Sequence, residues 1–84
     1  METAVPAANP LTLAQIPAGT CARITHIVGG KGLIRRLLGL GLRVGSEISV
    51  LQQRRRGVVV ASAGTRVALG ASVADKLLMQ PLDR

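Results

Sequence analysis

Residues 46–70, SEISVLQQRRRGVVVASAGTRVALG, decide the fold that this sequence predicts. Two groups of turn-forming residues divide the stretch into three runs that are rich in β-branched residues. Arg54–Arg56 suits a three-residue loop, and Ala63-Gly64 suits a two-residue turn. The stretch therefore predicts a meander of three antiparallel strands.

The two predicted turns agree with each other, because they place the apolar residues of all three strands on one face. The first turn sets Val50 opposite Val60, and the second sets Val60 opposite Val67. Polar residues such as Glu47 and Arg66 then fall on the other face. The predicted apolar face consists of Ile48, Val50, Val58, Val60, Val67 and Leu69.

Two further strands flank the meander. Alternating residues between Thr20 and Val28 predict one of them, and Leu77–Met79 predicts the other. Arg23 and Thr25 suit solvent, so the alternate residues of the first strand are expected to face inward. These are Ala22, Ile24, His26 and Val28.

Short helices are predicted in the connections. Apolar residues recur at helical spacing from Leu33 to Leu40, and Gly41 suits the position just after a helix end. A shorter helical segment covers Val73 to Lys76, with Ser72 as its N-cap. The predicted fold class is mainly β: a small, partly open barrel of about five strands with one or two short helices in the connections.

A chain of 84 residues supports one domain. Residues 1–10 contain two prolines and no periodicity, which predicts a flexible N-terminal lead, and residues 11–84 form the domain. At its start, Thr12 is expected to cap a short turn whose Leu13 and Ile16 face inward.

The composition restricts the partners. A net charge of +7 predicts an acidic partner, which could be nucleic acid, an anionic membrane or an acidic protein face. No Phe, Tyr or Trp is present to stack on bases, so nucleic acid is not the expected partner. The single cysteine excludes a disulfide within the chain, and no apolar stretch has the length of a membrane span or the pattern of a signal peptide. We expect a cytoplasmic protein.

Few residues are available for metal binding or catalysis. Cys21 and His26 are five residues apart on one predicted strand, so without a bulge they point to opposite faces. They are metal candidates only across an oligomer, and oligomerisation stays open. We predict no cofactor, although Fe²⁺ or another transition metal stays open. No acid–base pair or activated nucleophile is evident, so we predict no enzyme.

Two motifs each allow a functional and a purely structural interpretation. Gly29–Gly32 could bind an anion at a helix N-terminus, but the motif lacks the ending of a phosphate-binding loop, so a strand-to-helix turn is favoured. Arg54, Arg55 and Arg56 could make an electrostatic contact with an acidic protein or phosphate surface. The alternative, a solvated hairpin tip that discourages aggregation, is favoured over that contact.

The leucine-rich helix is the strongest candidate for a binding site. A short helix on a small barrel buries about three of its apolar residues, which would leave an exposed strip beside basic side chains. A barrel that covers all of them is the alternative. The expected partner-binding residues are Leu33, Ile34, Leu37, Leu38, Leu40 and Leu42, with Arg35, Arg36 and Arg43.

The order of these elements and several motifs resemble the FeoA family, ferrous iron transport protein A, over about residues 11–80. The most specific motif is RRLLGLGL at residues 35–42, followed by Gly45, and the later motifs GxxVALG at 64–70 and ADKL at 74–77 are also similar. The chain departs from the family pattern at Val44, at Gly70 and in its short arginine-rich loop.

The resemblance implies an SH3-like barrel that assists bacterial ferrous iron uptake beside FeoB, a membrane transporter with a cytoplasmic G domain. We expect the chain to bind that cytoplasmic portion and to be peripheral to the membrane through it. The alternatives are a basic nucleic-acid-binding module and a transition-metal-sensing domain. A GTPase-activating role is a further alternative, in which Arg36 or Arg43 enters the nucleotide site of the G domain. Whether the protein activates, assembles or restrains the transporter stays open.

Overall fold

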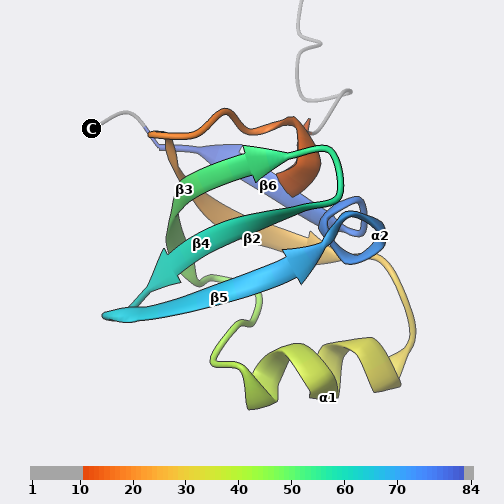
Figure 1. The fold of residues 1–84 in the computed structure, drawn as a ribbon. Coiled ribbons are helices and arrows are strands. Elements are labelled where there is room, and N and C mark those ends of the chain that lie inside the picture. The colour runs from red at the N-terminus through yellow and green to blue at the C-terminus, as the bar shows by residue number, and fades with distance from the viewer. Residues whose placement is uncertain (1–10, 83–84) are drawn as a thin grey trace, which may run out of the picture.

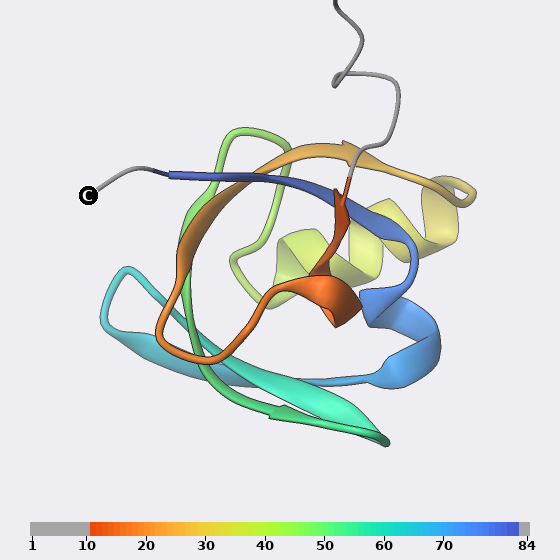
Figure 2. The same ribbon diagram turned by 90° about the horizontal axis from the view of Figure 1, so that it is seen from above.

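The computed structural model describes residues 11–82, which form one sheet of six antiparallel strands with short helices in the connections (Figure 1). The sheet curls around its own inner face, as the view along it shows (Figure 2). The predicted lead, residues 1–10, lies outside the described residues. Along the chain the elements are β1 (Leu11–Thr12), the 3₁₀ helix η2 (Leu13–Gln15), β2 (Cys21–Ile27), α1 (Lys31–Gly39), β3 (Glu47–Arg54), β4 (Gly57–Ser62), β5 (Thr65–Gly70), α2 (Ala71–Ala74) and β6 (Leu77–Pro81).

The strands are ordered β1-β6-β2-β3-β4-β5 across the sheet, so the meander of β3, β4 and β5 forms one half of it. Val60 lies opposite both Val50 and Val67, as predicted. The predicted two-residue turn joins β4 to β5, and Ala63 (φ 51°) and Gly64 (φ 83°) both have the positive φ that such a turn requires.

The loop between β3 and β4 is shorter than predicted. Arg54 pairs with Gly57, so the turn consists of Arg55 and Arg56 alone. Three residues before Arg54, Leu51 forms a bulge, because Val50 and Gln52 pair with the consecutive residues Val60 and Val59. The bulge restores the register that the shorter turn would have shifted.

A second bulge corrects the prediction for β2. Ile24 pairs with Met79 and His26 with Leu78, which leaves Thr25 as the extra residue. Beyond the bulge the inward and outward positions are exchanged, so Ile27 is buried while His26 and Val28 are exposed. The prediction that His26 and Val28 face inward is therefore wrong.

The core lies on the inner face of the curled sheet and is built from aliphatic side chains. The predicted apolar face of the meander is buried throughout, and η2 adds Leu13 and Ile16, which are fully buried as expected. Helix α2 begins at Ala71 with Gly70 as its N-cap, two residues before the predicted segment, so Ser72 is not the cap. The buried residues are Leu13, Ile16, Ala22, Ile24, Ile27, Leu37, Leu42, Ile48, Val50, Val58, Val60, Val67, Leu69, Ala74, Leu77 and Met79.

Candidate docking surface on helix α1

Helix α1 lies outside the sheet, on the side away from the β3–β4 turn (Figure 1). Its start is set by glycines: Gly29 has a φ of 150°, and Gly30 is the N-cap. An added Cβ at Gly29 would lie 2.9 Å from the Cδ2 atom of Leu33, which packs against the core. The glycines thus allow a close strand-to-helix turn, as the structural interpretation of Gly29–Gly32 expected.

The end of α1 determines which leucines become buried. Gly41 has a φ of 86°, its N–H donates to the carbonyl of Leu38 at 2.9 Å, and the Leu42 N–H donates to the carbonyl of Leu37 at 2.9 Å. This pair of hydrogen bonds is a Schellman motif, as the predicted helix-ending role of Gly41 requires. It turns the chain so that Leu42, like Leu37, enters the core.

The remaining apolar residues of this segment are exposed. Leu38 and Val44 are each 55% exposed, Leu40 is 44% exposed and Ile34 is 43% exposed. We name these four residues the α1 surface. Ile34 and Leu38 are four residues apart and therefore adjacent on one side of the helix.

Three of the residues expected to bind a partner have a different position. Leu37 and Leu42 are buried and Leu33 is half-buried, so these side chains hold the segment on the barrel. The expected exposed strip is present, and it includes Val44, which sequence reasoning did not select. A signal existed, because Val44 is an apolar residue between Arg43 and a glycine in a turn.

Basic side chains lie in the same segment as the α1 surface. Arg35, Arg36 and Arg43 are all exposed, and residues 31–46 contain no acidic residue. Arg35 is three residues from Leu38, so it lies beside the apolar side of the helix. The segment therefore combines exposed apolar side chains with exposed positive charge.

The predicted arginine run lies elsewhere. Arg54, Arg55 and Arg56 are exposed at the β3–β4 turn, which both views place far from α1 (Figures 1 and 2). The structure thus gives the chain two separate basic regions rather than one continuous patch.

Cys21 and His26 do not come together. Because of the Thr25 bulge both lie on the outer face of β2, but about four residue steps of strand, or roughly 13 Å, separate them. One metal ion would need both donor atoms within about 2.3 Å. Among residues 11–82 no group of three or more His, Cys, Asp or Glu side chains is close enough to hold a metal ion.

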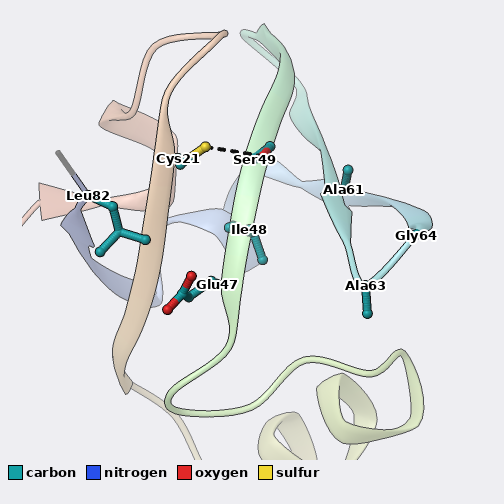
Figure 3. Close-up of a pocket in the computed structure, with 8 residues that line it drawn as sticks. All are labelled: Cys21, Glu47, Ile48, Ser49, Ala61, Ala63, Gly64 and Leu82. Atoms are coloured by element: carbon teal, nitrogen blue, oxygen red, sulfur yellow. Dashed lines mark hydrogen bonds between the residues drawn. The ribbon is translucent and has the colours of Figure 1, made fainter. Parts of the chain in front are cut away.

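Cys21 instead lies at a shallow pocket of about 280 Å³ on the outer face (Figure 3). Its Sγ atom is 3.3 Å from the Oγ atom of Ser49 on the neighbouring strand. Glu47, also at the pocket, accepts a hydrogen bond of 2.7 Å from the guanidinium of Arg23. Separately, within residues 11–82 no helix has both the length and the apolar character that crossing a bilayer requires.

Solved structures with the same fold belong to iron-transport and metal-regulatory proteins. A crystal structure of the iron uptake regulatory protein FeoA is 25% identical, with a TM-score of 0.82, over 88% of this chain and 100% of that one. The solution structure of FeoA from Chlorobium tepidum is 25% identical, with a TM-score of 0.77, over 87% of this chain and 71% of that one. A manganese-dependent transcriptional repressor is 22% identical with a TM-score of 0.82, and matches 93% of this chain but 44% of its own. These neighbours confirm the predicted SH3-like barrel.

Sequence comparison leads to the same family. A Methanocaldococcus jannaschii protein that carries the provisional name Fe(2+) transport protein A is 26% identical over 57 residues, which are 68% of this chain and 70% of that protein. The family model of the FeoA domain matches residues 11–81. Because that match spans almost all of the described residues, the chain belongs to the FeoA family of ferrous iron transport accessory proteins.

Proposed function

We propose that this protein assists ferrous iron uptake by binding the cytoplasmic portion of a FeoB-type transporter through its α1 surface. It works in the cytoplasm, is peripheral to the membrane through that partner, and acts as a binding module without chemistry of its own. The observation that carries the proposal is the exposure of Leu38, at 55%, on a short helix whose neighbouring Leu37 is buried.

Burial of exposed aliphatic side chains supplies the affinity in this proposal. Transfer of apolar surface from water is worth roughly 25 cal/mol per Å², and contiguous exposed apolar residues mark interaction sites. Ile34 and Leu38 are adjacent on one side of α1, so one complementary apolar groove can cover both, and Leu40 and Val44 follow at the end of the helix and in the next loop.

Electrostatic attraction supplies the rate of encounter. Arg35, Arg36 and Arg43 border the α1 surface without any acidic residue in the same segment, so an acidic surface on the transporter would attract it. Because border charges act mainly on association, replacement of Arg36 and Arg43 by Gln should slow association and reduce its salt dependence. Dissociation should change much less.

A pull-down with the cytoplasmic portion of the transporter tests the proposal. The Leu38→Ser variant should be retained less than the wild type. Leu51→Ser on β3 is the matched control, because Leu51 is also an exposed leucine, at 40%, but lies outside the α1 surface. Leu42 is unsuitable for this test because its substitution would disrupt the core. Equal retention of the wild type and a folded Leu38→Ser variant would refute the proposal.

A further inference from the structure

A second hollow of about 360 Å³ lies on the outer face of β3, β4 and β5, next to the arginine-bearing turn. None of the residues that line it belongs to the α1 surface, and none is acidic. Its lining consists of Gln52, Arg54, Arg56, Gly57, Val58, Val59, Ala68, Leu69 and Gly70.

The hollow results from small residues in neighbouring strand positions. Arg54 pairs with Gly57, and Gly57 pairs with Gly70, so two consecutive positions of this cross-strand row have no side chain. In the next cross-strand row on the same face, Val59 pairs with Ala68, so the side chains at the bottom of the hollow are also short. Only glycine fits at position 57, since an added Cβ would lie 2.5 Å from the Leu69 carbonyl oxygen.

The groups at the rim of the hollow are suited to an anion. Arg54 and Arg56 are exposed, and a guanidinium has five N–H donors and no acceptor. The described part of the chain, residues 11–82, gives neither arginine an ion-pair partner. Two guanidinium groups at one hollow, next to an uncharged floor, suit an anionic ligand that carries carboxylates or phosphates.

The hollow also borders an edge of the sheet. Among the described strands β5 pairs only with β4, so one side of its backbone faces no neighbouring strand. An extended peptide can hydrogen-bond to such an edge as an added strand. Its residue beside Gly70 would then face Arg54 across two glycines, with no side chain between them.

We propose that this hollow is a second docking site, which takes an extended acidic segment of a partner protein with its carboxylates on Arg54 and Arg56. The site uses a different face from the α1 surface, so a partner can occupy both at once. The two proposals stand independently, because each rests on residues that the other does not use.

Fluorescence anisotropy with a labelled peptide of alternating glutamate and threonine tests this site. The double variant Arg54→Gln, Arg56→Gln should bind the peptide at least about tenfold more weakly, because it loses two charge-assisted contacts. The matched control, Lys31→Gln with Lys76→Gln, removes the same charge from two exposed positions outside both proposed sites and should bind as the wild type does. Equal weakening by both pairs would show that net charge alone acts, and would overturn the proposal.

A filling variant tests the hollow without a change of charge. Ala68 is exposed on the outer face, so Ala68→Leu should fold and should fill the floor. Gly70→Leu is the second filling variant, because its added Cβ meets nothing within 4 Å. Both should weaken peptide binding while an unchanged melting temperature confirms folding. Peptide binding equal to that of the wild type in both, or tighter wild-type binding of random DNA than of the peptide, would overturn the proposal.

Discussion

The backbone N–H of Leu42 donates to the carbonyl oxygen of Leu37 at 2.9 Å, and this hydrogen bond closes the turn that ends α1. Both side chains enter the core, while Leu38 and Leu40 stay at the surface. One local motif therefore divides a leucine-rich segment into residues that anchor the helix and residues that remain available to a partner.

This division predicts that the same substitution has very different effects on stability at two leucines. Leu42→Ser should lower the free energy of unfolding by at least about 3 kcal/mol, because it leaves a cavity and buries a hydroxyl. Leu38→Ser should change it by less than about 1 kcal/mol, because the side chain is mostly in water. Urea unfolding measures both, and similar losses at the two positions would contradict the assignment.

The helix-ending turn predicts a contrast between two glycines. Gly41→Ala should cost about 1 kcal/mol, because a φ of 86° is unfavourable for a residue with a Cβ. Gly39→Ala should gain up to about 1 kcal/mol, because Gly39 is helical and its added Cβ meets nothing within 4 Å. The same unfolding measurement reads both changes, and a gain at Gly41 would show that the turn does not hold.

A polar contact fastens η2 to the sheet and predicts a further contrast. The half-buried Gln53 side chain donates from Nε2 to the carbonyls of Ile16 at 2.6 Å and Leu13 at 3.0 Å. Gln53→Met should cost about 1–3 kcal/mol, because it leaves both acceptors without this donor. Gln52→Met, on the exposed outer face, is the control and should change stability by less than about 0.5 kcal/mol. Equal effects in thermal unfolding would argue against the contact.

The β4–β5 turn contains a position that can be improved. Ala63 has a φ of 51°, which costs an L-residue with a Cβ about 1–2 kcal/mol, whereas asparagine tolerates this region. Ala63→Asn should therefore raise the free energy of unfolding by about 0.5–1 kcal/mol. Ala61→Asn, within β4, should not, because asparagine is unfavourable in strands. A loss at position 63 would mean that the turn has another conformation.

Much of the barrel could be predicted from the sequence because the alternation and turn residues of the meander supported each other. Ala63-Gly64 forms the turn that the sequence indicated, and Gly41 ends α1 as its position suggested. These features are local, so neighbouring residues determine them. A small barrel followed from the number of such elements, and the resemblance to the FeoA family implied that it is SH3-like.

The two bulges could not be predicted, because nothing about Thr25 or Leu51 distinguishes it from an ordinary strand residue. A bulge depends on the partner strand: Thr25 donates from Oγ1 to the Leu78 carbonyl at 3.1 Å, a contact between residues 53 positions apart. A single extra residue exchanges the two faces beyond it. A prediction without the bulge therefore puts His26 on the inner face, whereas the structure has it on the outer face. In β3 the bulge and the shorter turn cancelled, so the register of Val50 was predicted correctly from a wrong loop length.

The candidate site was predicted in outline rather than residue by residue. Helical spacing located the apolar segment, but spacing alone cannot show that Leu42 folds back into the core while Val44 remains outside. That difference depends on the chain direction after Gly41, which follows from its φ of 86°. The second hollow could not be foreseen, because it also requires the two-residue β3–β4 turn, which sets Arg54 opposite Gly57.

Isothermal titration calorimetry of this protein with the cytoplasmic portion of the FeoB-type transporter tests the central claim most directly. The double variant Ile34→Ser, Leu38→Ser should bind at least about tenfold more weakly than the wild type, while Leu51→Ser should bind with unchanged affinity. A folded double variant whose Kd equals that of the wild type would contradict the assignment of the α1 surface as the docking site.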